Sequence, residues 1–259
     1  MTFKDFNALL IRLFLGYLFT SSGLCKLTDG HFGQLIGPPL LIEQLTPHGL
    51  RTFGFFIAIS QIMAGALVLS QRYALLGLIM LVPMNLGILM VTISQNWTGT
   101  PYVDAVFTTL NLIALLYEWN TLKFLLLPEK TTVQIPPKVN QYFPHIWLPV
   151  CTISLLGICC FCSRYSYLAT TIIAAFAYMM AYINVFRSRL SPWSYRLVLA
   201  MSLLAILTIT FIGYLLKLPW PINPMLLMGV PILGTLLIYL GTLIWVFLGK
   251  KKALQNMQG

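Results

Sequence analysis

Long apolar runs recur along the whole chain, separated by short polar segments. A helix needs roughly 17 to 25 apolar residues to cross a hydrocarbon core about 30 Å thick. Proline is tolerated inside such helices, so Pro83 and Pro231 do not interrupt the pattern. The sequence predicts eight membrane-spanning helices, at about 8–27, 51–70, 74–94, 103–126, 146–162, 165–187, 196–216 and 224–248.

Composition agrees with this all-α polytopic membrane class. The 259 residues are 58% hydrophobic and 8% charged, whereas a soluble domain carries roughly 25% charged residues. The net charge of +10 does not indicate nucleic acid, because it is distributed by side of the membrane. With both termini in the cytoplasm, twelve Lys and Arg lie inside and four outside, as the positive-inside rule requires. We therefore predict a multi-pass protein of the bacterial inner (cytoplasmic) membrane, with the lipid bilayer as its main partner and no nucleic acid.

One long polar segment containing several prolines divides the chain. It lies at 126–147, with four predicted helices on each side and no internal repeat. We accordingly predict a four-helix transmembrane bundle over 1–127, a cytoplasmic linker over 128–145 and a second four-helix region over 146–259. Most intramembrane ionisable and amide residues fall in the first bundle, so any chemistry is expected there.

Two of the predicted helices carry matched stripes of residues. In each stripe the spacing is four, three, four and three, and residues three and four apart share one face of a helix. The stripe in the first helix ends in cations and the one in the fourth helix ends in carboxylates. The first consists of Arg12, Gly16, Phe19, Gly23 and Lys26, and the second of Asp104, Thr108, Asn111, Leu115 and Glu118.

These stripes predict two ion pairs inside the first bundle. The two helices run in opposite directions, so Arg12 lies at the depth of Glu118, and Lys26 at the depth of Asp104. Intramembrane charges are expensive and usually pair in a bundle interior, and the glycines of the first stripe would let the two helices approach closely. The alternative is that Arg12 and Glu118 reach separately to the membrane interface, since each lies near a helix end.

Amide side chains add polarity near the middle of the membrane. Gln61 lies on the second predicted helix and Asn85 on the third, while Asn184 is the main interior polar residue of the second half. Together with Asn111, Gln61 and Asn85 are candidates to line a polar site. Interhelical hydrogen bonding is the other interpretation, and the sequence leaves both open.

The first half resembles the DoxX-like family of small four-helix membrane proteins. The resemblance rests on the Arg-x3-Gly-x2-Phe-x3-Gly-x2-Lys stripe of the first helix, a polar residue on the second, the short turn in "SQRYALLGLIM" and the acidic start of the fourth. It covers residues of about 6–126. Many members have a glutamate where this chain has Gln61, which argues against proton handling there. The resemblance implies partnership with redox or envelope membrane complexes, since the family is named after a subunit of a thiosulfate:quinone oxidoreductase.

Five cysteines and three histidines complete the candidate chemistry. Cys159 and Cys162 form a Cys-x-x-Cys pair at the predicted outer end of the fifth helix, and residues three apart on a helix can come within disulfide range. They are candidate redox thiols, although cysteine is also a common buried apolar residue. The histidines lie in predicted loops without metal-ligand spacing, so no metal is expected.

Three functions follow from these residues. The first is a non-catalytic subunit or assembly partner of a bacterial envelope or redox membrane complex, bound to other membrane or periplasmic proteins and without a cofactor. The second is a quinone- or thiol-linked membrane oxidoreductase component. The third is a small-molecule or lipid carrier with a polar cavity in the first four helices. The sequence leaves open whether the protein is an enzyme.

Overall fold

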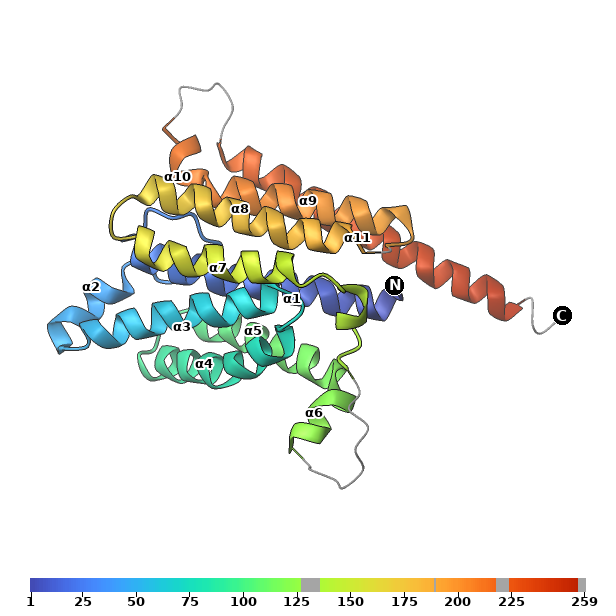
Figure 1. Ribbon diagram of the computed structural model, residues 1–259, viewed down its shortest axis with the longest axis horizontal. Helices are drawn as coiled ribbons and strands as arrows, with labels where there is room; N and C mark the ends of the chain where they lie inside the picture. The colour runs from blue at the N-terminus through green and yellow to red at the C-terminus, as the bar shows by residue number, and fades with distance from the viewer. Residues whose placement is uncertain (127–135, 189, 218–223, 256–259) are drawn as a thin grey trace.

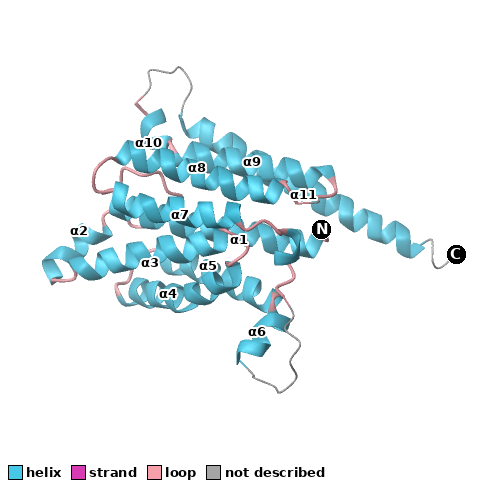
Figure 2. Cartoon of the chain, viewed as in Figure 1, coloured by secondary structure: helices cyan, strands magenta, loops and turns pink. Residues whose placement is uncertain are grey.

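The computed structural model describes residues 1–126, 136–188, 190–217 and 224–255, and every regular element in these ranges is a helix (Figures 1 and 2). The all-α prediction is confirmed. The short elements are α2 (Leu41–Leu45), α6 (Trp119–Leu126), α10 (Ile212–Leu215) and the 3-10 turns η1 (Thr46–His48) and η2 (Asn140–Tyr142). The long helices are α1 (Phe3–Leu27), α3 (Arg51–Leu69), α4 (Ala74–Ser94), α5 (Thr100–Tyr117), α7 (Trp147–Cys162), α8 (Tyr167–Phe186), α9 (Trp193–Thr210) and α11 (Pro224–Gln255).

Six helices in the described part of the chain are long and apolar enough to cross a membrane. They are α1, α3, α4, α8, α9 and residues Leu226–Leu248 of α11. Each corresponds to one of the eight predicted spans. The other two predicted spans correspond to α5 and to α7, an apolar helix of 16 residues. The chain is thus a multi-pass helical membrane protein.

The prediction of one continuous helix over 103–126 is wrong. α5 ends at Tyr117, α6 begins at Trp119, and the chain changes direction between them (Figure 1). Glu118, at the break, has φ −97° and ψ 22°. Its carboxylate is held by Arg12 and by two backbone N–H groups of the segment after residue 135. The apolar pattern continues through α6, so the break comes from tertiary contacts rather than from local sequence.

α1 lies at the centre of the molecule, between α3, α4 and α5 on one side and α7, α8 and α9 on the other (Figure 1). In its apolar window 83% of the residues are buried, more than in any other candidate span of the described chain. Leu15, Leu18 and Phe19 belong to a core shared with the first side. Phe6 and Tyr17 belong to a second core, shared with α7, α8 and α9. α1 therefore contributes to both halves of the chain.

Aromatic contacts hold the second half against α1. The ring of Phe6 stacks on that of Tyr195, with centroids 3.9 Å apart. Tyr17 meets Tyr178 edge-on, and the hydroxyls of Tyr178 and Thr20 lie 3.1 Å apart. All five side chains are buried, so these contacts fix α8 and α9 against the central helix.

The two glycines of the first stripe face α3, and not the helix of the second stripe as predicted. A Cβ on Gly16 would lie 2.6 Å from Leu69 Cγ, and one on Gly23 would lie 2.6 Å from the carbonyl oxygen of Ala58. Gly65 of α3 returns the contact, since a Cβ there would lie 2.8 Å from the Gly16 carbonyl oxygen. Small residues on both helices thus let the backbones of α1 and α3 touch, as is usual in membrane packing.

Candidate functional site

The predicted pairing of Arg12 with Glu118 is present. Nη2 of Arg12 lies 2.7 Å from Oε1 of Glu118, and both side chains are fully buried. No other ion pair shorter than 4 Å occurs among the residues that the structure describes. Breaking a buried ion pair by removing one partner leaves the other charge uncompensated. We call this end of the helix bundle the Arg12 end.

Backbone groups of the predicted linker complete the site around Glu118. The Lys138 N–H donates to Glu118 Oε2 at 2.6 Å, and the Val139 N–H donates to Oε1 at 3.2 Å. Asn140 accepts from Arg12 Nη1 at 3.3 Å and donates to the carbonyl of Arg72 at 2.7 Å. The segment from Lys138 to Asn140 therefore closes the Arg12 end. The sequence did not indicate this role, because spacing along a helix says nothing about a distant loop.

Asp5 forms a second polar cluster at the same end, which was not predicted from the sequence. Its side chain accepts hydrogen bonds from the hydroxyls of Tyr117 (2.5 Å), Tyr142 (2.9 Å) and Thr2 (2.6 Å). The Thr2–Asp5 part is a capping box, which starts α1 five residues earlier than predicted. Burial and the bond to Asp5 raise the pKa of Tyr142. The sequence signal was Thr2-x-x-Asp5, which predicts a helix start but not its tyrosine partners.

The predicted pair of Lys26 and Asp104 is not formed. Lys26 is buried, and its Nζ donates instead to the carbonyl (3.1 Å) and hydroxyl (2.6 Å) oxygens of Ser22. Oδ2 of Asp104 is buried and accepts no hydrogen bond from the described residues. The matched spacing predicted contact at the Arg12 end correctly, but at the opposite end, the Lys26 end, Ser22 on the same helix provides the partner.

Several amides predicted to be interior are buried and incompletely paired. Within the described ranges, Gln61 Oε1, Asn85 Nδ2 and both amide atoms of Asn111 have no hydrogen-bond partner. These three residues come from α3, α4 and α5, which with α1 form the first bundle. Asn184, on α8, is likewise buried with both amide atoms unpartnered. Buried polar groups are usually hydrogen-bonded. The interior of the first bundle therefore contains polar atoms that could bond to a ligand or to water.

The candidate thiols lie at the end of α7. Cys159 is buried, and its Sγ lies 3.6 Å from the carbonyl oxygen of Thr170, whereas Cys162 is partly exposed. Both are free thiols. The described residues contain no group of three or more His, Cys, Asp and Glu side chains that could hold a metal ion.

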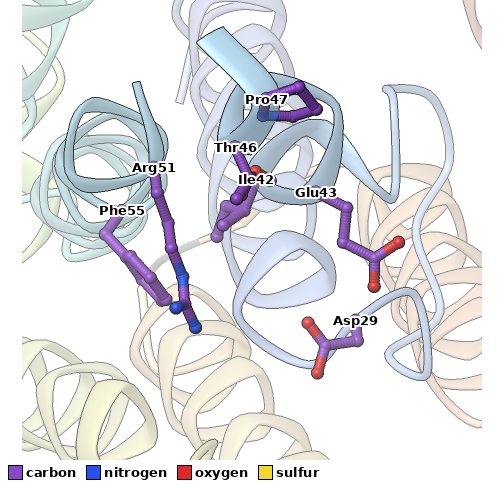
Figure 3. A pocket seen from close by; sticks show the side chains of 7 residues that line it. All are labelled: Asp29, Ile42, Glu43, Thr46, Pro47, Arg51 and Phe55. Atoms are coloured by element: carbon purple, nitrogen blue, oxygen red, sulfur yellow. Dashed lines mark hydrogen bonds between the residues drawn. The ribbon is translucent and has the colours of Figure 1, made fainter. Parts of the chain in front are cut away.

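A pocket opens at the Lys26 end, where the α1–α2 loop meets the start of α3 (Figure 3). It has a volume of about 440 Å³. Arg51 and Phe55 form one wall, and the carboxylates of Asp29 and Glu43 lie across from them (Figure 3). The remaining lining residues are Ile42, Thr46 and Pro47. No sequence pattern indicated a site at these residues, since they come together only through the fold of the loop.

Comparisons with protein-family models, with curated proteins and with solved structures found no match to this chain.

Proposed function

We propose that this chain is a DoxX-like inner-membrane protein that acts as a non-catalytic subunit or assembly partner of a bacterial envelope or redox membrane complex. In this proposal it spans the membrane eight times, with α5 and α7 as the additional spans. The Arg12 end and both termini lie in the cytoplasm, and the Lys26 end lies outside. The contact between the first and fourth predicted helices supports the resemblance, because Arg12 of the family-like stripe is paired there.

The observation that carries the proposed role is the exposure of α11. Only 11% of the residues in its apolar window are buried within the molecule. α11 packs on α9 and extends past the other helices at the Arg12 end (Figure 1). A Cβ added to Gly229 or Gly241 would meet no atom within 4 Å among the described residues. Small residues on an open helix face are typical of helix association in membranes.

The buried ion pair of Arg12 and Glu118 also favours a non-catalytic role. Arg12 and Glu118 are bonded to each other and closed off by the linker. A general acid or base must reach its substrate directly or through one water. A sealed pair holds the fold together, and it leaves the lipid-facing helices as the surface for association.

Photo-crosslinking from α11 tests this proposal. A photoreactive amino acid at the exposed positions Leu237 and Ile244 should give adducts with one defined membrane protein in cells. The same group at Met90, equally exposed on α4, should give lipid adducts only. Gly241→Trp should abolish co-purification of that protein, while Gly87→Trp, which also points into open space, should not. Lipid adducts alone at both α11 positions would overturn the proposal.

A second candidate, binding of a small polar molecule inside the first bundle, is favoured by the unpartnered atoms of Gln61, Asn85, Asp104 and Asn111. A polar ligand or bound water would satisfy them, because buried water typically makes about three hydrogen bonds to such groups. Gentle purification of the protein, followed by identification of the small molecules that it retains, tests this candidate. A stoichiometric polar molecule released on denaturation, and lost in Asn111→Leu, would support the candidate over the assembly role.

A further inference from the structure

The pocket at the Lys26 end separates opposite charges across one cavity. The guanidinium of Arg51 lies on one side, and the carboxylates of Asp29 and Glu43 lie on the other (Figure 3). Within the described part of the chain, none of the three makes an ion pair shorter than 4 Å. Opposite charges that do not neutralise each other leave a site for a ligand that carries both signs.

Arg51 and Asp29 are each held in place by a neighbour. The Arg51 guanidinium carbon lies 5.8 Å from the centroid of the Phe55 ring, in cation–π range. Oδ2 of Asp29 accepts a hydrogen bond from Tyr167 at 3.1 Å, and its Oδ1 accepts none from the described residues. Arg51 and Asp29 are therefore positioned, while one carboxylate oxygen of Asp29 and the guanidinium N–H groups stay available.

Asp29 occupies its position against local preference. It follows the end of α1 with φ 49°, and the Gly30 N–H donates to the Cys25 carbonyl at 2.9 Å, which closes the helix end. Glycine is the usual residue at such a left-handed position. A carboxylate at a helix C-terminus is also electrostatically unfavourable. The helix end gains nothing from this carboxylate, whose contacts are the hydrogen bond from Tyr167 and the pocket.

From this geometry we infer that the pocket binds a small zwitterion with a primary ammonium and a phosphate group, the chemistry of phosphoethanolamine. The ammonium lies against Asp29 and Glu43, and the phosphate against Arg51, whose planar fork suits phosphate oxygens. A volume of about 440 Å³ accommodates such a group. The inference does not depend on the proposed assembly role.

Two sources could supply this group: the headgroup of phosphatidylethanolamine or a soluble phosphoethanolamine compound. Exposed apolar residues lie on the first turns of α3, close in the chain to Arg51 and Phe55: Phe53 is 49% and Phe56 is 65% exposed, and Leu50 precedes the helix at 45%. In a membrane this part of α3 faces lipid, within two helical turns of the pocket. A binding experiment therefore has to include both sources.

Native mass spectrometry of the full-length protein, with added lipids of defined headgroup, tests the inference. Phosphatidylethanolamine should bind about tenfold more tightly than phosphatidylcholine, whose methylated amine has no N–H, or phosphatidylglycerol, which has no amine; this is the change expected for one lost charge-assisted hydrogen bond. O-phosphoethanolamine is the soluble probe. If O-phosphoethanolamine displaces phosphatidylethanolamine, a soluble phosphoethanolamine compound is sufficient for binding. If only the lipid binds, the ligand is the headgroup in a membrane.

Variants locate the binding. Asp29→Asn combined with Glu43→Gln should remove the preference for the primary amine. Arg51→Gln should weaken the binding of both phosphatidylethanolamine and phosphatidylcholine by about tenfold. Arg164→Gln, an exposed cation in the turn after α7, is the matched control and should change neither. Glu43→Gln alone, on the exposed face of α2, serves if the double variant does not fold. Equal binding of all headgroups together with no effect of O-phosphoethanolamine, or a preference that survives the double variant, would overturn the inference.

Discussion

At the scale of single residues, the buried pair of Arg12 and Glu118 connects segments that are far apart in the chain. One carboxylate accepts a guanidinium and two backbone N–H groups, so it joins α1, the end of α5 and the linker at one point. The sequence predicted the ion pair because helix geometry places residues 14 apart on one face at matching depths. It could not predict the linker contacts, since no local pattern relates Lys138 to a helix twenty residues earlier.

A double-mutant cycle measures this pair. Arg12→Ala and Glu118→Ala should each lower the stability of the detergent-solubilised protein, by up to roughly 3–5 kcal/mol for a buried pair and by less if membrane values apply. The double variant should lose less than the sum, because no orphan charge remains. The Glu118 variant should be the more damaging single change, since it also leaves two N–H groups unpaired.

Lys26 and Asp104 provide the matched control for that cycle. Lys26 lies 14 residues after Arg12 on α1, and Asp104 lies 14 residues before Glu118. The two residues make no ion pair shorter than 4 Å. Lys26→Met and Asp104→Asn should therefore couple more weakly in thermal unfolding than Arg12 and Glu118 do. Coupling of equal size in both cycles would show that the ion pair of Arg12 and Glu118 does not add to the stability of the protein.

At the scale of elements, the apolar pattern predicted the helices well and their partners poorly. The predictions of a continuous helix through Glu118 and of Gly16 and Gly23 facing the fourth predicted helix were both wrong. Both outcomes depend on tertiary contacts, with Arg12 and the linker at Glu118 and with α3 at the glycines. The stripe on α1 correctly predicted that another helix approaches closely. That helix is α3, the next long helix along the chain. Periodicity identifies the face of a helix and leaves the identity of its neighbour to tertiary structure.

Gly23→Ala tests the α1–α3 contact. The new methyl group would lie 2.6 Å from the Ala58 carbonyl oxygen, so the backbones must separate and the melting temperature in detergent should fall. Overpacking of this kind typically costs about 1–3 kcal/mol. Gly157→Ala, in the middle of α7 with no neighbour within 4 Å of the new carbon, is the control. It should leave the melting temperature unchanged or raise it, because alanine favours the helix by roughly 0.8–1.0 kcal/mol. Equal effects of the two changes would mean that α1 and α3 do not touch here.

At the scale of the whole molecule, α1 is common to both halves. Apolarity along the sequence did not signal this, because α4 and residues Leu226–Leu248 of α11 are more apolar than α1 and are far less buried. The division at the linker predicted two consecutive bundles, and it did not indicate that Phe6 and Tyr17 would pack on α8 and α9. Only contacts between residues far apart in the chain, such as Phe6 with Tyr195, reveal the shared core.

Labelling of single cysteines in a cysteine-free variant tests the proposed eight-span topology. Thr98, in the exposed α4–α5 turn, and Tyr165, 89% exposed between α7 and α8, should react with an impermeant thiol reagent from outside the cell. Thr98 is preferable to its neighbour Gly99, where φ 81° disfavours a side chain. Gln141, in η2, should react only after the inner membrane is opened, because the positive-inside distribution places the linker in the cytoplasm. If α5 or α7 did not cross the membrane, Gln141 would share a side with Thr98 or with Tyr165. Labelling of Gln141 from the same side as either residue would therefore exclude the eight-span arrangement, whereas the reverse distribution for all three would invert the protein in the membrane without changing its fold.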